Sequence, residues 1–242
     1  MPRFYCPQAL LPTTTIELPE AVAHHLHVVR QQPGDELVLF NGEGGQVRAR
    51  LVEVGKRRAS AEVLAREDVD VELPFRVTLA QGLPEGSKMD WIVEKAVELG
   101  VTAIQPLAAR RSVVKLAGDR ADKRLAHWQA VVVSASEQCG RNRLAEVAPL
   151  QEFGRWIAQP AGDAVRILLS PRADASLAAW TKTTAPCDVS LLVGPEGGFS
   201  TEEEDAAIAA GALPLSMGPR VLRTETAGLA TLAILAAGWG GI

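Results

Sequence analysis

Two segments near the C-terminus hold the residues best suited to chemistry. The first, Leu191–Ser200, reads LLVGPEGGFS, and the second, Ser216–Thr226, reads SMGPRVLRTET. In each, a short apolar run leads through glycine and proline to a polar residue that can begin a helix. The glycines permit backbone angles closed to other residues and let a ligand approach the main chain. Arg220 and Arg223 are costly near a core unless they are paired or face a ligand.

Either loop alone is as well explained by an ordinary turn as by a binding site. Two such loops in tandem, the second followed by an apolar helix, favour a ligand site. Val189–Val193 has the composition of a strand buried on both faces, and Ser200 with Glu203 forms a capping box. Loops that follow strands in this way bind ligands in open α/β sheets. We expect Thr224 to cap the final helix, which is apolar all round and must be buried on several sides.

The motifs of several common enzyme classes are absent. The chain has neither G-x-G-x-x-G after a strand nor G-x-x-x-x-G-K-[ST], which excludes the usual dinucleotide and P-loop sites. Only His127 lies in the second half, so no Ser/His/Asp order is compelling. Cys6, Cys139 and Cys187 are far apart, form no C-x-x-C pair and fit a reducing compartment. The chain thus offers binding loops and basic groups without an evident nucleophile.

The elements that position these loops follow from apolar patterning. We expect a small β-rich domain over residues 1–72 and a second domain over residues 73–242, because the acidic segment Glu67–Pro74 marks a shift in composition. Strand and helix alternate in the second domain, which predicts a largely parallel sheet with helices on both sides. The predicted strands are 36–40, 46–54, 59–65, 75–80, 101–107, 165–169, 189–193 and 213–216; the predicted helices are 21–30, 88–99, 122–138 and the final helix from 224.

Composition and charge limit the partners. The chain is 47% hydrophobic and has a net charge of −4, so it is an ordinary globular protein. Residues 73–155 nevertheless carry 12 Lys and Arg against 9 Asp and Glu, which permits a local RNA footprint. No apolar run reaches about 18 residues and no signal pattern opens the chain, so we expect a cytoplasmic protein.

Three histidines lie close together in the predicted helix 21–30: His24, His25 and His27. No cysteine or carboxylate stands at ligand spacing beside them, so we expect no metal site. Two interpretations remain open, a solvated helix face and a face turned to RNA, to which Arg30 would contribute charge.

The two C-terminal motifs resemble a known signature. GPEGGFS at 194–200 followed by GPRVLRTETA at 218–227 is similar to the C-terminal signature of the SPOUT-type RNA methyltransferases. Within them, the chain resembles the ribosomal RNA small subunit methyltransferase E family. Lys95–Gly100 matches that family's K-x-x-E-L-G pattern, and segments around Arg3-Phe4-Tyr5 and His24–Arg30 match its N-terminal pattern. The resemblance covers essentially the whole chain.

The resemblance implies a fold, a cofactor and an assembly. The expected fold class is α/β, a SPOUT trefoil-knot methyltransferase domain with a mostly parallel sheet, preceded by a PUA-like β-barrel domain that binds RNA. S-adenosyl-L-methionine is the implied cofactor, and a homodimer is implied, with the apolar final helix as the natural interface. The implied cofactor residues lie in three loops: Leu169, Ser170, Val193, Gly194, Pro195, Glu196, Gly197, Gly198, Ser216, Met217, Gly218 and Leu222.

The family substrate is a uridine in 16S ribosomal RNA of the small subunit, methylated at N3. Uracil N3–H is a weak acid, so a base or a charge that stabilises the anion must assist the transfer. We hypothesise that Arg223 stabilises the anion and that Glu98 or Glu225 takes the proton. Arg223 has an alternative role, a structural pair with Glu225 or Glu196, and the alternative for Glu98 is a solvated helix pair.

The predicted RNA contacts are basic or imidazole side chains. For Arg141 and Arg143, phosphate contact and a buried structural pair are equally good interpretations. Two other functions remain open: ribose 2′-O methylation, whose early Asn-x-Gly-x-x-x-Arg motif is missing, and a non-catalytic module for RNA binding or ribosome assembly. The predicted RNA-binding residues are Arg3, His25, Arg30, Arg110, Arg111, Arg141 and Arg143.

Overall fold

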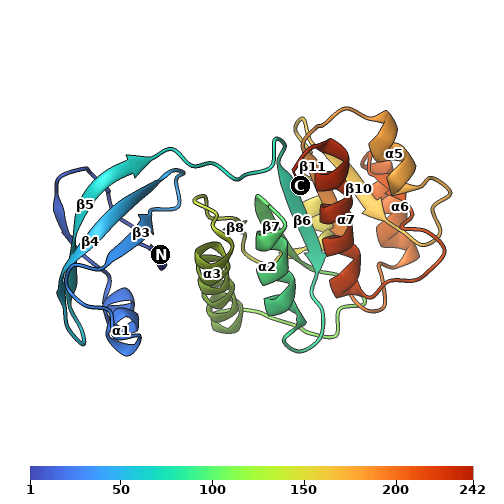
Figure 1. Ribbon diagram of the computed structural model, residues 1–242. Helices are drawn as coiled ribbons and strands as arrows, with labels where there is room; N and C mark the ends of the chain where they lie inside the picture. The colour runs from blue at the N-terminus through green and yellow to red at the C-terminus, as the bar shows by residue number, and fades with distance from the viewer. Residues whose placement is uncertain (242) are drawn as a thin grey trace. The chain divides into compact units, whose positions relative to one another are not determined.

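The computed structural model describes residues 1–241 and divides into two compact units (Figure 1). The first unit consists of Met1–Glu72 together with Ser136–Leu144. The second consists of Leu73–Ala135 and the chain from Ala145 onward. The N-terminal segment of the first unit ends at residue 72, and the domains 1–72 and 73–242 remain a prediction. The return of residues 136–144 to the first unit has no counterpart in the sequence-based expectation.

The first unit is built on a five-stranded sheet in the order β1-β3-β4-β5-β2. Strands β3, β4 and β5 form an antiparallel meander, while β1 pairs with β3 in parallel. Along β4, Val47, Ala49 and Leu51 are buried and alternate with more exposed residues, as expected for a sheet with one face on a core. Helix α1 covers that core with Val22, Ala23 and Leu26. The bounds are β1 Arg3–Tyr5, β2 Thr15–Glu17, α1 Glu20–Val28, β3 Glu36–Phe40, β4 Gln46–Val54 and β5 Ala59–Glu67.

The second unit contains a seven-stranded sheet whose paired strands all run parallel. Its order is β12-β10-β11-β6-β7-β8, with the short β9 also paired to β7. The central strand β11 is buried at all five positions, because helices cover both faces. The bounds are β6 Val77–Gly82, β7 Ala103–Ala108, β8 Glu146–Val147, β9 Gln151–Glu152, β10 Val165–Leu169, β11 Val189–Val193 and β12 Leu213–Leu215.

Helices enclose this sheet on its two faces. Helix α7 packs so closely on β6 that a Cβ on Gly228 would lie 3.1 Å from Leu79 Cδ1, and α2 lies beside α7 (Figure 1). On the other face, Phe153 and Trp156 of α4 and Ala207 of α6 form a core with Leu168. The bounds are α2 Lys88–Glu98, α3 Asp119–Cys139, α4 Phe153–Ile157, α5 Leu177–Thr183, α6 Thr201–Ala209 and α7 Thr224–Trp239.

Most of the patterned elements are found where the sequence predicts them. The strands 36–40, 46–54, 165–169 and 189–193 are confirmed with identical bounds. The capping box of Ser200 and Glu203 is present at α6, and α7 is buried on several sides, as predicted. The short elements β1, β2, β8, β9, α4 and α5 were not predicted. None of the helices in residues 1–241 combines the length and the hydropathy of a membrane-spanning segment.

Candidate functional site

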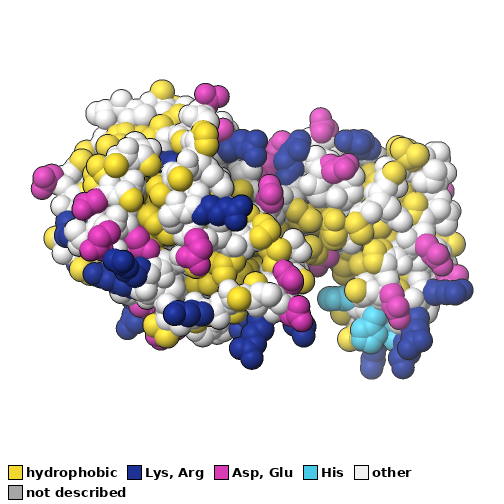
Figure 2. Space-filling model, turned by 180° about the vertical axis from the view of Figure 1, so that it is seen from behind, with side chains coloured by type: hydrophobic (Ala, Val, Ile, Leu, Met, Phe, Trp, Pro, Cys, Tyr) yellow, Lys and Arg dark blue, Asp and Glu magenta, His cyan; other side chains and the backbone are white. Residues whose placement is uncertain are grey.

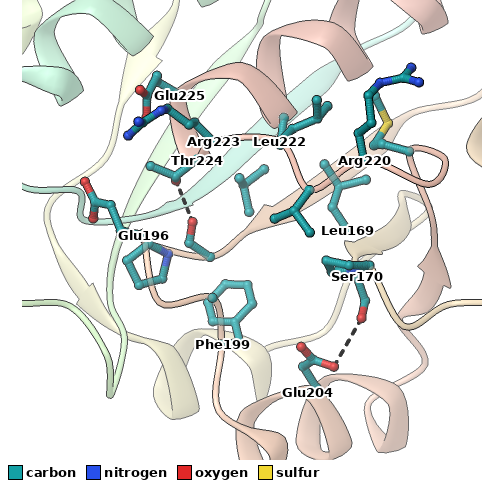
Figure 3. A pocket seen from close by; sticks show the side chains of 18 of the residues that line it. Leu169, Ser170, Glu196, Phe199, Glu204, Arg220, Leu222, Arg223, Thr224 and Glu225 are labelled. Carbon is teal, nitrogen blue, oxygen red and sulfur yellow. Dashed lines mark hydrogen bonds between the residues drawn. The ribbon is translucent and has the colours of Figure 1, made fainter.

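A cavity of about 290 Å³ lies in the second unit where three neighbouring parallel strands end. Its walls come from the loops that follow β10, β11 and β12 and from the first turns of α6 and α7 (Figure 3). The volume is near the lower end, about 300 Å³, of the range for small-molecule sites. The carboxyl ends of strands at one edge of an α/β sheet are the usual position for such a site.

Ten of the twelve predicted cofactor residues line this cavity. Gly197 and Ser216 do not line it. The carbonyl oxygen of Gly197 instead accepts a hydrogen bond from Arg111, and the Ser216 hydroxyl accepts one from Gly218 N, so both shape the loops from outside. The ten that line it are Leu169, Ser170, Val193, Gly194, Pro195, Glu196, Gly198, Met217, Gly218 and Leu222.

The cavity also contains residues that the sequence did not single out as cofactor contacts. Glu204 follows Ser200 by one helical turn and therefore lies on the same face of α6 as Ser200. The capping box predicted from the sequence could have indicated its position. The others lie within the three predicted loops or directly beside them, and only that neighbourhood could have indicated them. They are Pro171, Phe199, Arg220, Val221, Thr224 and Ala227; Arg223 and Glu225, predicted as catalytic, also line the wall.

Glycines allow the loop after β11 to pack against its neighbours. A Cβ on Gly194 would lie 2.7 Å from the backbone nitrogen of Phe199. A Cβ on Gly82, at the end of β6, would lie 2.6 Å from Pro195 Cδ. Contacts under 3.0 Å force the neighbour to move, so any larger residue at these two positions displaces the cavity wall. These glycines serve close packing of backbone, whereas the sequence-based reasoning assigned Gly194 to ligand approach.

The expectation that Thr224 caps α7 is wrong. The N-cap residue is Arg223, and its side chain makes no capping hydrogen bond. The Thr224 hydroxyl instead donates to Gly194 O at 2.6 Å and accepts from Gln81 Nε2 at 2.8 Å. Both Thr224 and Gln81 are buried, so this relay joins β6, the loop after β11 and the start of α7 in the interior. A tertiary partner for the hydroxyl has therefore replaced the local cap.

One end of the cavity collects charged groups: Glu196, Arg223 and Glu225 lie together there (Figure 3). Lys88 Nζ and the backbone N–H of Glu85 both donate to Glu196 Oε1. Burial acts to raise the pKa of Glu196, but the hydrogen bonds from Lys88 and from the backbone outweigh it and hold that pKa below its ordinary value. The hydrogen bond to Glu196 likewise raises the pKa of Lys88. Both groups are therefore charged at neutral pH.

Glu225 differs from its neighbour Glu196. Its Oε2 atom is buried and has no hydrogen-bond partner among residues 1–241. A buried carboxylate oxygen without a donor is costly unless a ligand supplies one.

A second polar group lies on the opposite side of the cavity. Ser170 Oγ donates to Glu204 Oε2 at 3.3 Å (Figure 3), and the Arg172 guanidinium pairs with the same carboxylate oxygen. Leu169 and Leu222 lie between the two polar ends (Figure 3), and Val193 adds a further apolar side chain to the lining. The cavity therefore suits an elongated ligand with an apolar middle and polar ends.

Glu98, the third predicted catalytic residue, does not lie with the other two. It stands at the C-terminal end of α2, whose first residue Lys88 contacts the cavity wall. Ten residues of helix separate them by about 15 Å. Lys95 Nζ donates to Glu98 Oε1 at 2.7 Å, which is the solvated helix pair foreseen as its alternative role. The structure thus brings Arg223 and Glu225 together and leaves Glu98 outside the cavity.

Arg110 and Arg111, predicted to contact RNA, hold the loop after β11 and the start of α6. Arg111 Nη1 donates to the carbonyl oxygens of Gly197 at 2.8 Å and Phe199 at 3.2 Å. Arg110 pairs with Glu202 at 3.0 Å, with its side chain 68% exposed. Arg111 therefore has a structural task beside the cavity, while Arg110 remains accessible from solvent.

In the first unit, the side chains of Arg3 and Arg141 make structural contacts within the protein. Arg141 is 3% exposed and its guanidinium pairs with the Glu72 carboxylate, so the structural pair is the better of its two interpretations. Arg3 donates to Gln46 Oε1 and to Asn142 Oδ1, the latter at 2.7 Å. The contacts of Arg3 and Arg141 join residues 141–142 to β1 and to Glu72, which follows β5.

The remaining predicted RNA contacts of the first unit are exposed. Arg143 is 55% exposed, although its Nη1 donates to Glu43 O at 2.6 Å. His25 packs edge-on against the Phe4 ring at 5.3 Å but is open to solvent, as is Arg30. Figure 2 shows histidine side chains beside Lys and Arg side chains at the end of the unit where α1 lies. This surface is accessible to a polyanion.

Family models match both parts of the chain. An RNA methyltransferase domain model matches residues 71–236, and an RNA methyltransferase PUA domain model matches residues 18–64. A ribosomal RNA small subunit methyltransferase E from Neisseria gonorrhoeae, bound to S-adenosyl methionine, superposes with a TM-score of 0.92 at 39% identity over 99% of this chain and 98% of that chain. A methyltransferase from Legionella pneumophila with bound cofactor SAM gives 0.91 at 34% identity, over 97% of this chain and 96% of that chain.

Sequence relatives agree with the structural ones. The ribosomal RNA small subunit methyltransferase E of Synechocystis is 37% identical over 90% of this chain and 72% of that protein. The Bacillus subtilis protein of the same name is 33% identical over 89% of this chain and 87% of that protein. The parallel α/β unit and its cavity define an RNA methyltransferase of the SPOUT class with an N-terminal PUA-like domain, which confirms the expected fold class. Within that class, the chain belongs to the ribosomal RNA small subunit methyltransferase E family.

Proposed function

We propose that this protein methylates N3 of a uridine in 16S ribosomal RNA, at the position numbered 1498, with S-adenosyl-L-methionine as donor. The observation that carries the proposal is the cavity at the ends of β10, β11 and β12, with Arg223 and Glu225 at one end. The names of the relatives and the cofactor bound by two of the solved structures support it.

The residues of the cavity fit this donor. The apolar middle, with Leu169, Val193 and Leu222, suits an adenine ring, and the surrounding loops offer backbone groups to its edges. The polar ends suit the ribose hydroxyls and the charged methionine part. Gly198 and Gly218 have positive φ values of 66° and 96°, and a Cβ there would meet nothing within 4 Å, so backbone is open to the ligand at both points.

Two residues would serve the reaction at N3. The bound donor supplies a methyl group already activated by the positive sulfur. Glu225 is the better placed of the two proposed proton acceptors, because it lines the same cavity as Arg223 and its buried Oε2 lacks a donor among residues 1–241. The N3 proton passes to this carboxylate as N3 gains the methyl group. Arg223 stabilises the negative charge that develops on the uracil ring.

The surroundings of this site follow from the same proposal. We assign residues 1–72 to RNA binding and residues 73–242 to methyl transfer, with His25, Arg30, Arg143 and Arg110 as the exposed candidates for RNA contact. We also propose a homodimer that acts in the cytoplasm and pairs through α7. Supporting this interface, α7 keeps a half-exposed stripe of small residues that includes Ala230, Ala233 and Ala237.

The decisive experiment supplies labelled donor to small ribosomal subunits that lack the modification. We expect label in 16S RNA, with the methyl located on the uracil ring by nuclease digestion and mass spectrometry. A methyl on the ribose would replace the proposal with 2′-O methylation. Absence of both label and donor binding would leave only a binding role. Sedimentation of the free protein tests the dimer separately.

A further inference from the structure

The carboxylate of Glu196 is held in place at the charged end of the cavity. Its Oε1 receives hydrogen bonds from Lys88 Nζ and, at 3.0 Å, from Glu85 N. The Glu196 side chain is 31% exposed and the Lys88 side chain 33%. Glu196 lines the cavity and Lys88 does not, so a ligand meets the carboxylate before the ammonium.

We propose that this fixed carboxylate recognises the positive sulfur of the methyl donor and thereby distinguishes the donor from its spent product. The inference rests on the proposed function, because the donor's sulfur must lie near the groups that act on the uracil. Arg223 and Glu225 mark that end of the cavity, and Glu196 lies with them (Figure 3). After transfer the sulfur is a neutral thioether, and its attraction to Glu196 is lost.

A positive sulfur needs this kind of partner. It carries no N–H or O–H, so it cannot act as an ordinary hydrogen-bond donor, and in a site that desolvates it a nearby negative charge stabilises it. Glu204 is already engaged by Ser170 and Arg172 at the other side of the cavity. Glu225 is reserved for the proton of the substrate. Glu196 remains as the carboxylate that lines the cavity and is held in place by Lys88 and by the backbone N–H groups of Glu85 and of Glu196 itself.

Calorimetry with S-adenosylmethionine and S-adenosylhomocysteine tests the inference on the intact protein. Wild-type protein that binds neither molecule would refute the proposed function itself. Given binding, we expect Glu196→Gln to lower the affinity for the donor about tenfold, which corresponds to about 1.4 kcal/mol. We expect the affinity for the product to fall less than twofold. The matched control is Glu204→Gln, a carboxylate in the same cavity, which we expect to leave the ratio of the two affinities unchanged.

Two outcomes overturn the inference. An equal loss of affinity for both molecules would mean that Glu196 contacts a part they share, such as the amino group. No loss of affinity for either molecule would mean that Glu196 contacts neither. Lys88→Met provides a second variant that keeps the carboxylate. Removing Lys88 raises the pKa of Glu196. As the pH is lowered, the carboxylate of the variant is therefore protonated sooner, and the preference for the donor over the product must be lost at a higher pH than in the wild type. An identical pH dependence would also count against the inference.

Discussion

The hydroxyl of Thr224 and the carbonyl oxygen of Gly194 lie 2.6 Å apart and form a hydrogen bond in the interior of the second unit. Gln81 completes the relay by donating to the same hydroxyl and to Gly82 O at 2.9 Å. The bond between Thr224 and Gly194 therefore fixes the loop after β11 relative to the first turn of α7. Both segments line the cavity, so the relay sets the cavity's width.

Thr224→Val should separate the contribution of this hydrogen bond from that of the side chain's shape. Valine keeps the volume but leaves Gly194 O and one N–H of Gln81 without a partner, which costs about 1–3 kcal/mol in a buried site. We expect a lower free energy of unfolding in urea and weaker binding of S-adenosylhomocysteine. Thr224→Ser keeps the hydroxyl and should retain most of both. A valine variant as stable as the wild type would show that the relay carries little free energy.

The relay also shows where prediction from sequence ends. The apolar runs of β10 and β11 identify strands, and the glycine and proline after them identify loops, because these signals are local. Thr224 is a good helix cap by the same local rules. Its actual partner Gln81 is 143 positions away in the chain, and only the folded sheet brings the two together.

A similar limit applies to the candidate catalytic residues. Arg223 and Glu225 come from one motif in one loop, so they share a site wherever that loop lies. Glu98 belongs to a different motif, and its distance from the site depends on the direction of α2, which periodicity does not give. The short β8, β9 and α4, of two to five residues, are too brief to show a period at all.

From the buried pair of Arg141 and Glu72 we predict that removing either partner destabilises the fold, whether or not RNA is bound. Removing one partner leaves the other charge buried, at a cost of about 3–5 kcal/mol. We expect Arg141→Met and Glu72→Gln each to destabilise the protein in urea by that order. Arg143→Met, two residues on and largely exposed, should cost about 1 kcal/mol or less. If Arg141→Met instead kept full stability and lost affinity for RNA, the phosphate interpretation of Arg141 would be restored.

Arg166 presents a buried cation without a carboxylate partner among residues 1–241. Its guanidinium donates to Ile157 O at 2.8 Å and Gln159 O at 2.6 Å and lies over the Trp156 ring at 4.8 Å. Burial lowers the pKa of Arg166, which reflects the cost of holding the charge there. The side chain thus closes the end of α4 through two carbonyl groups and the Trp156 ring.

We expect Arg166→Lys to be less stable than Arg166→Met. An ammonium keeps the cost of a buried charge but lacks the planar fork that reaches both carbonyl groups. Methionine removes the charge and still packs on Trp156. Urea unfolding at neutral pH should place the lysine variant lowest, with a loss of about 1–3 kcal/mol relative to the wild type. A methionine variant less stable than the lysine variant would mean that the charge itself stabilises the fold.

Cys6 provides a pH-dependent prediction for the first unit. The residue is fully buried, and burial raises the pKa of its thiol from 9.0 to about 11, although a hydrogen bond with Gln8 acts in the opposite direction. Between these two values the unfolded chain loses the proton and the folded chain keeps it. Stability is therefore fully present below about pH 9 and falls as pH rises toward 11, by roughly 2–3 kcal/mol from this group alone.

Cys6→Ala isolates that contribution from the other groups that titrate at alkaline pH. The alanine variant lacks the thiol, so the unfolding free energy of the wild type minus that of the variant should fall by roughly 2–3 kcal/mol as pH rises from 9 to 11. The small cavity left by the sulfur lowers the variant's stability equally at every pH and does not alter that trend. Urea denaturation of both proteins at intervals across this range measures the difference directly. A difference that stays constant with pH would mean that the Cys6 thiol has the same pKa in the folded and unfolded chain.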